Sequence, residues 1–172
     1  MKNLIIISSL LFFGQLNAQN QAVDSSVVKT IDGIVNYTYE LLSAKEDKVK
    51  NLEKMKFLYL PTARFTLLYH ATDTKPAYYE SVTMDEFFEF VYDDREYYEK
   101  GFTQYELGKV VNEYNGIANV FQSFYAKDSD NEEATGITSY QLIYFQERWW
   151  IADLMWTNNT NNVPIPEKYL KN

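Results

Sequence analysis

The sequence predicts an α+β protein in which helices come first and a strongly curved antiparallel sheet follows. Two observations carry this prediction. Before residue 101, apolar residues recur at three- and four-residue steps, as helices with one buried face require. After residue 101, strand-like stretches follow one another with short, turn-prone connections, which favour antiparallel pairing. No internal repeat and no linker rich in Gly, Pro or Ser divides the chain, so one domain is expected.

The N-terminus has the layout of a secretory signal peptide. Lys2 precedes an apolar run from Leu4 to Phe13, and the chain turns polar after Ala18. This run is too short to cross a bilayer as a helix, which needs about 20 residues. We therefore expect residues 1–18 to be removed and the mature chain to be exported, to the periplasm or outside the cell, without a membrane span.

Two helices are expected next. Val28 and Val35 belong to an apolar stripe over residues 24–44, which predicts a long first helix. A similar stripe over residues 47–58 predicts a second helix, and Pro61 prevents it from continuing.

A strand and a third helix follow. Residues 64–70 are rich in the bulky and β-branched side chains that favour a covered strand. Thr83 and Glu86 then form a capping-box pattern, in which each side chain can bond the other residue's backbone amide. The third helix is expected from Met84 to near Gly101, a residue suited to the turn after a helix end.

Four long strands complete the chain. Turn-prone segments separate them, including Tyr114-Asn115-Gly116 and the acidic stretch Asp128–Glu133. This acidic stretch lacks the glycine and the final glutamate of a calcium loop, so it is interpreted as a solvated hairpin loop. The four strands are expected at about residues 102–113, 117–127, 136–147 and 148–156.

Composition restricts the partners. The formal charge of −8 would repel nucleic acid and anionic membrane surfaces. The chain has no cysteine, so neither a disulfide nor a lipid-modified cysteine is available. Phosphate-binding glycine loops, His-Glu-x-x-His helices and Gly-x-Ser-x-Gly elbows are absent from the sequence, and no cofactor or metal is predicted. Aromatic residues make up 17% of the chain, which suits either a cavity wall or a sheet core filled by bulky rings.

The order of elements, together with several short motifs, resembles the nuclear transport factor 2-like (NTF2-like) superfamily, and among its members the bacterial SnoaL-like proteins. The resemblance implies a cystatin-like cone over residues 19–162, in which a strongly curved antiparallel sheet wraps around three N-terminal helices, followed by a tail at 163–172. It also implies a cavity at the wide end and, often, a homodimer. Because the superfamily includes isomerases, dehydratases, cyclases and binding subunits, the fold alone does not give the function. The motifs are Ala63–Phe65, Met84–Phe87, Gly101-Phe102, Gly116–Phe121, Gly136–Leu142 and Arg148–Ile151.

Three residues are candidates for acid–base chemistry. Glu106 matches an acidic position of the SnoaL-like proteins, and Arg64 is expected to pair with it, in either a structural or a catalytic role. Asp153 lies among apolar residues, but strand alternation could equally turn it toward solvent. His70, at a strand end, could face the cavity beside Asp73 or be exposed.

The penultimate strand offers two faces, of which one can line the cavity. Ser139 and Gln141 share one face, and Tyr140 and Leu142 share the other. The Ser-x-Gln pattern is part of the resemblance, so we expect Ser139 and Gln141 to contact the ligand, although the same residues could bond within the sheet.

Three hypotheses follow. The first is an exported, non-catalytic protein that binds a small apolar or amphipathic ligand, with Arg64, Glu106, Ser139 and Gln141 as polar contacts. The second is an isomerase, dehydratase or cyclase that uses Glu106 or Asp153 as general base. The third is a dimeric structural or assembly module.

Overall fold

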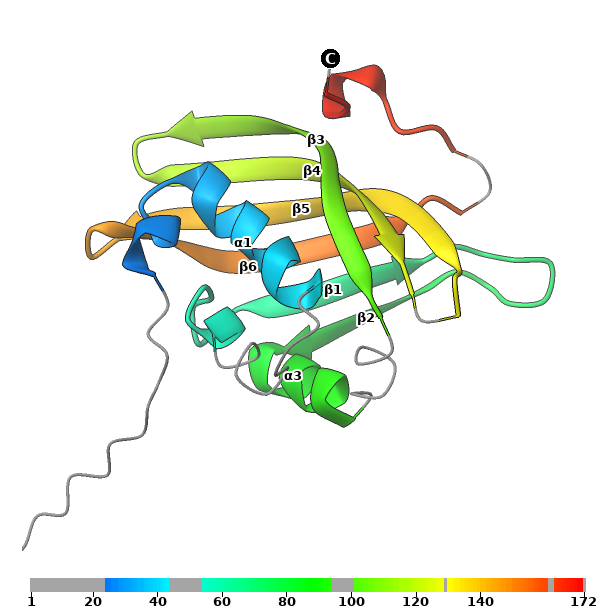
Figure 1. The fold of residues 1–172 in the computed structure, drawn as a ribbon. Coiled ribbons are helices and arrows are strands. Elements are labelled where there is room, and N and C mark those ends of the chain that lie inside the picture. Colours follow the sequence, from blue (N-terminus) through cyan, green and yellow to red (C-terminus); the bar gives the residue numbers. More distant parts are fainter. Residues whose placement is uncertain (1–23, 44–53, 94–100, 129, 161–162, 172) are drawn as a thin grey trace, which may run out of the picture.

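A computed structural model describes residues 24–43, 54–93, 101–128, 130–160 and 163–171 of the 172-residue chain (Figure 1). It contains one six-stranded sheet in the order β2-β1-β6-β5-β4-β3. Only the β1–β6 pair is parallel, and the other four pairs are antiparallel. The predicted α+β class is confirmed. The strands are β1 (Arg64–Tyr69), β2 (Tyr78–Thr83), β3 (Thr103–Tyr114), β4 (Ile117–Lys127), β5 (Glu133–Phe145) and β6 (Arg148–Asn158).

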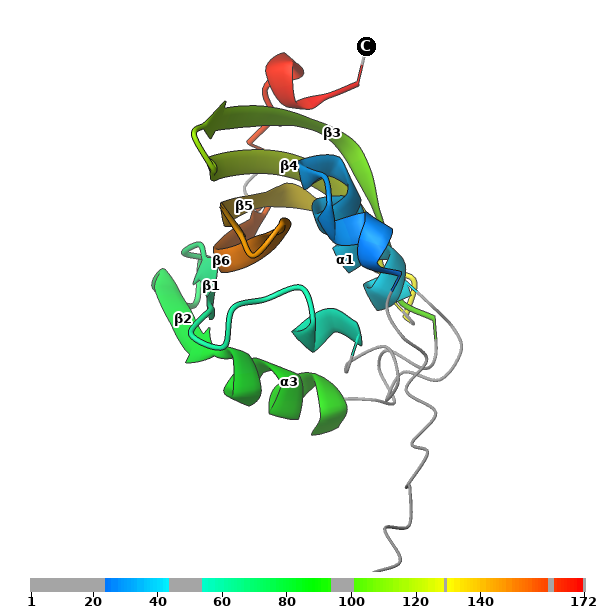
Figure 2. The same ribbon diagram turned by 90° about the vertical axis from the view of Figure 1, so that its left-hand side faces the viewer.

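The sheet is curved and has its helices on the concave side. Figure 2 shows the strands as an arc from β3 to β2, with α1 (Ile31–Ser43) inside the arc and α3 (Met84–Asp93) next to its β2 end. Irregular register adds to the curvature, because an extra residue bends a strand and increases its twist. The register shifts between Glu106 and Gly108 in β3, and beside Gln141 where β5 pairs with β6.

The predicted first helix is divided into two. A short 3-10 helix, η1 (Ser25–Val28), precedes α1, and two residues six positions apart, Asp24 and Thr30, cap the two helix starts. The carboxylate of Asp24 accepts a hydrogen bond from the amide of Ser26, and the hydroxyl of Thr30 accepts one from the amide of Gly33. Of the second predicted helix, residues 54–56 are helical and residues 47–53 lie outside the described part of the chain.

The third helix begins where the capping box predicts. The amide of Thr83 donates to the Glu86 carboxylate at 2.8 Å, and the amide of Glu86 donates to the Thr83 hydroxyl at 3.3 Å. Helix α3 is described as far as Asp93, and its expected continuation toward Gly101 lies outside the described residues. The predicted signal peptide at residues 1–18 lies outside them as well.

Strand β2 was missed by sequence reasoning. It is an edge strand that pairs only with β1 and is exposed along most of its length. Its sequence therefore lacks the alternation of apolar and polar residues that a half-buried strand requires.

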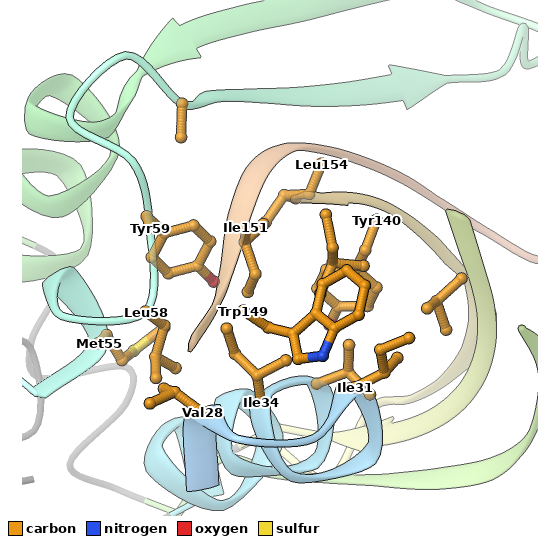
Figure 3. Packing of buried hydrophobic residues seen from close by; sticks show 14 of the residues in the cluster. Val28, Ile31, Ile34, Met55, Leu58, Tyr59, Tyr140, Trp149, Ile151 and Leu154 are labelled. Carbon is orange, nitrogen blue, oxygen red and sulfur yellow. The ribbon is translucent and has the colours of Figure 1, made fainter. Parts of the chain in front are cut away.

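The hydrophobic core lies between α1 and the concave face of the sheet. Figure 3 shows Ile31 and Ile34 of α1 facing Tyr140, Trp149 and Ile151 of β5 and β6. The tandem tryptophans divide between the two faces as alternation predicts, because Trp149 is buried in this core while the Trp150 ring stacks on Arg148. No helix in the described part of the chain is long and apolar enough to cross a membrane.

Candidate functional site

A cavity opens on the concave side of the sheet and has two connected parts. The inner chamber has a volume of about 130 Å³, and the outer chamber, toward the solvent, has a volume of about 460 Å³. Phe87, Phe102, Gln104 and Trp156 line both chambers, so we treat them as one site, the cone cavity. The inner chamber is otherwise lined by Thr38, Tyr39, Leu42, Met55, Tyr59, Phe65, Thr138, Tyr140 and Leu154.

The outer chamber is aromatic and has an acidic rim. Tyr69 and Phe90 add rings to the shared aromatic residues. Asp128, Glu132 and Glu133 contribute the acidic residues, and no lysine or arginine is among the described residues that line either chamber. An anionic ligand group would therefore meet an unfavourable field at the entrance.

Buried hydroxyl groups gather in the inner chamber and form what we call the hydroxyl cluster, consisting of Thr38, Tyr39, Tyr59, Thr138 and Tyr140. The Tyr39 hydroxyl donates to Thr138 Oγ1 at 3.2 Å. Tyr39 is also hydrogen-bonded to Tyr140, and Tyr59 to Thr38. Helix α1 supplies Thr38 and Tyr39, and β5 supplies Thr138 and Tyr140 at alternate positions on its concave face.

Burial raises the pKa of Tyr39, Tyr59 and Tyr140 far above the usual range, because the charged phenolate would lose its hydration. All three phenols therefore stay protonated at neutral pH. By giving up a bond within the cluster, such a phenol can donate a hydrogen bond to an oxygen acceptor of a ligand without bringing charge into the chamber.

Glu106 is held in a separate ion cluster, in which it contacts Lys109, Lys171 and Gln122. The distances from its carboxylate are 2.7 Å to Lys109 Nζ, 3.1 Å to Lys171 Nζ and 2.7 Å to Gln122 Nε2. Lys109 also pairs with Asp32 of α1 at 3.2 Å. The bulge in β3 makes this possible, since the extra residue restores Glu106 and Lys109, three positions apart, to the same face.

The neighbours of Glu106 stabilise its charged form. Burial alone would raise its pKa, but the hydrogen bonds from Lys109, Gln122 and Lys171, together with the positive charge of Lys109, lower it below the ordinary value. A general base needs a pKa near neutrality and access to a ligand. Glu106 has neither feature, because its pKa is lowered and it does not line the cone cavity.

The predicted ion pair between Arg64 and Glu106 is wrong. Arg64 lies on β1 and Glu106 on β3, and three strands separate β1 from β3 in the sheet. The Arg64 guanidinium donates instead to the hydroxyl and the carbonyl oxygen of Ser81 on β2, at 3.2 and 2.6 Å. Arg64 therefore joins the two edge-side strands on the outer face.

Asp153 and His70 also lie outside the cavity lining. Asp153 is exposed, and its carboxylate accepts a hydrogen bond from the backbone amide of Arg64 at 3.1 Å. His70 Nε2 lies 2.9 Å from the Thr157 hydroxyl, and Thr157 belongs to the same face of β6 as Asp153. The structure thus places both candidate residues on the convex side.

For β5, the expected choice of face is wrong. Thr138 and Tyr140 line the inner chamber, so Ser139 and Gln141 point to the convex side. Ser139 accepts a hydrogen bond from Asn119 Nδ2 at 3.3 Å, which is the bond within the sheet considered as the alternative. Period-two alternation separates two faces but does not reveal which one is concave.

Sequence reasoning also missed the role of Tyr39. It falls within the predicted first helix at residues 24–44, where nothing in the local sequence indicates that its hydroxyl contacts β5. The signal was the tyrosine-bearing face of β5, which supplies the partners Thr138 and Tyr140. Among the described residues, no group of three or more acidic or histidine side chains could hold a metal ion.

Comparison with solved structures identifies the fold. The chain superposes on an NTF2-like protein with a cystatin-like fold from Novosphingobium aromaticivorans with a TM-score of 0.58 and 7% identity, covering 76% of this chain and 80% of that one. A proposed scytalone dehydratase from the same species gives 0.60 and 9%, covering 79% and 87%. A proposed ketosteroid isomerase from Shewanella frigidimarina gives 0.53 and 16%, covering 77% and 95%.

These likenesses define the class of fold. The chain has the NTF2-like, cystatin-like α+β fold, and the resemblance seen in the sequence is confirmed at that level. No protein-family profile and no curated protein matches the sequence. At 7–16% identity, the activities named for the solved proteins do not transfer to this chain.

Proposed function

We propose that this chain is an exported, non-catalytic binding protein whose cone cavity holds a small, largely apolar molecule with an oxygen acceptor. One observation carries the proposal: an aromatic chamber contains protonated tyrosine hydroxyls from two facing elements, α1 and β5. Apolar walls with a few convergent polar groups are typical of small-molecule sites. The N-terminal layout of Lys2 and the following apolar run supports export.

The same geometry indicates the polarity of the ligand. Tyr39 and Tyr140 can donate to a carbonyl, ether or hydroxyl oxygen, while the surrounding rings bury an apolar body. A ligand carboxylate is disfavoured because the described lining has no cation and the rim is acidic. We therefore expect neutral ligands to bind better than anionic ones of the same shape.

Binding is favoured over isomerase, dehydratase or cyclase chemistry by the positions of the candidate bases. Glu106 is fixed by two lysines, and Asp153 points to the convex side. A proton abstraction in the inner chamber would therefore need a base other than these two.

A pair of naphthalenes tests the proposal, with binding followed by quenching of tryptophan fluorescence, since Trp156 lines the cavity. 2-Acetylnaphthalene offers a carbonyl acceptor, and 2-ethylnaphthalene has nearly the same shape without one. The full chain should bind the ketone about fivefold more tightly, as one neutral hydrogen bond of about 1 kcal/mol predicts. Tyr39→Phe and Tyr140→Phe should each reduce this preference.

Tyr144→Phe is the matched control, because Tyr144 is half exposed and lies outside the cavity lining. It should leave the preference for the ketone unchanged. Equal affinities for the two naphthalenes in the wild-type chain, or a preference that survives both Tyr39→Phe and Tyr140→Phe, would contradict the proposal.

We also propose a homodimer that uses the convex face of the sheet. Leu68 and Met155, on the adjacent strands β1 and β6, expose apolar side chains on this face. An exposed apolar sheet face is a frequent site of self-association. Sedimentation velocity over a tenfold dilution should show a dimer that Met155→Glu converts to monomer, and a wild-type monomer at every concentration would exclude it.

A further inference from the structure

The C-terminal segment Glu167–Lys171 contacts the β3 bulge and the adjacent part of β4 through four different interactions. This segment comprises the short helix η2 (Glu167–Tyr169) and the two residues after it, and it lies beside β3 at the edge of the sheet (Figure 1). On the β3–β4 side, the contacting groups are a backbone carbonyl, a hydroxyl, an aromatic ring and a carboxylate.

The first two interactions are hydrogen bonds to the backbone of the segment. Leu107, the bulge residue, has no partner in the β3–β4 register, and its carbonyl accepts a hydrogen bond from the amide of Lys171 at 2.8 Å. The buried hydroxyl of Ser123 on β4 donates to the carbonyl of Tyr169. An edge strand otherwise exposes unpaired backbone groups, and here the chain's own C-terminus satisfies one of them.

The other two interactions involve side chains of the segment. The Tyr169 ring stacks on Phe121 of β4, with ring centres 5.6 Å apart and planes 20° apart. The Lys171 ammonium reaches the Glu106 carboxylate, which is 9% exposed, at 3.1 Å. The site thus accepts an aromatic side chain and, two residues later, a lysine.

A glycine makes the close approach possible. A Cβ built on Gly108 would lie 2.5 Å from the carbonyl oxygen of Tyr169 and 2.6 Å from the carbonyl carbon of Leu170. The backbone of Gly108 is not in the left-handed region, so the close contact, and not backbone conformation, explains the glycine. A side chain here would push the segment away from β3.

We propose that the β3 bulge is a peptide-binding site that recognises the sequence of this chain's own C-terminal segment, which docks there as a separable ligand. The ligand class is a short peptide that presents an aromatic residue, an aliphatic residue and a lysine in succession. The site is separate from the cone cavity, because none of the residues that contact the segment lines either chamber.

The test uses the full-length chain with its own segment disabled by Tyr169→Ala and Lys171→Ala. A fluorescent peptide with the sequence of residues 163–172 is added, and binding is measured by fluorescence anisotropy. This double variant should bind the peptide saturably. The wild-type chain should bind it at least tenfold more weakly, because its own tethered segment competes at an effective concentration of the order of millimolar.

Gly108→Val, added to the double variant, should weaken peptide binding at least tenfold, whereas Asn112→Val, on the same face of β3 beyond the segment, should not change it. A second peptide with Lys171→Glu tests the site without altering the protein, and it should bind at least fivefold more weakly because it faces Glu106. Absence of peptide binding by the double variant, or equal binding of the two peptides, would overturn the proposal.

Discussion

The concave face of the sheet carries two polar regions, and they solve the problem of burial in different ways. The hydroxyl cluster keeps its groups neutral, because burial raises the pKa of Tyr39 and Tyr140 and no charge forms. The ion cluster keeps its groups charged, because Lys109 and Lys171 both contact Glu106. The neutral region lines the cavity, and the charged region lies outside its lining.

The comparison shows which of the polar side chains are able to bind a ligand. A carboxylate surrounded by its own cations is fixed in its ionised form and is committed to structure. A neutral phenol in an aromatic chamber can rotate its hydroxyl group and donate a hydrogen bond to a bound ligand. The cavity is therefore equipped for recognition by hydrogen bonding, whereas Glu106 stabilises the framework outside it.

The largest expected effect comes from placing a carboxylate in the neutral region. Leu154 is 7% exposed and lines the inner chamber. At pH 7, Leu154→Asp should be less stable than the nearly isosteric Leu154→Asn by about 2–4 kcal/mol in unfolding free energy, since a buried charge without a partner is costly. Urea unfolding of both variants across pH 3 to 8 measures this difference.

The pH dependence of this difference has a definite sign. Burial would raise the pKa of the new carboxyl in the folded state, so the penalty is complete above that raised value. It should shrink as pH falls through the raised pKa and vanish below the unfolded value of about 3.9. Equal stability of the Asp and Asn variants at every pH would show that the chamber tolerates charge.

The sequence predicted the framework well because local patterns control it. The capping box at Thr83 and Glu86 and the turns between the long strands are determined by nearby residues, and the structure confirms them. Strand β2 was missed because its contacts come from β1 alone, and an exposed edge strand shows no apolar alternation.

The candidate site was less predictable because it depends on distant contacts and on one irregularity. Glu106 pairs with lysines and not with the predicted Arg64, because Lys171 is far away in sequence and Lys109 reaches it through a bulge. A bulge changes which residues share a face, and alternation alone does not reveal it. The role of Tyr39 likewise depends on how α1 packs against β5.

The smaller expected effect comes from neutralising the ion cluster. Glu106→Gln keeps the size of the side chain but removes the charge that holds Lys109 and Lys171, so unfolding free energy at pH 7 should fall by about 1–3 kcal/mol. The loss stays moderate because Lys109 retains Asp32 as a partner. Glu113→Gln, at an exposed position of the same strand, is the matched control and should change stability by less than about 0.5 kcal/mol.

The Glu106 carboxylate should affect stability with the opposite sign to the carboxylate that Leu154→Asp introduces, because it stabilises the fold when it is charged, and both effects should disappear in acid. The pKa of Glu106 is lowered in the folded state, so its contribution is present above the unfolded value of about 4.3 and is lost as pH falls through the folded value. The pKa of Lys109 is raised: burial alone would lower it, but the hydrogen bond and the charge of Glu106 outweigh burial. The stability that Lys109 contributes is therefore lost as pH rises through that raised value, above about 10.4. The difference in unfolding free energy between wild type and Glu106→Gln should therefore be largest between about pH 5 and 10 and should disappear in acid. A difference that stayed constant down to pH 2 would mean that Glu106 stabilises the fold through packing and not through its charge.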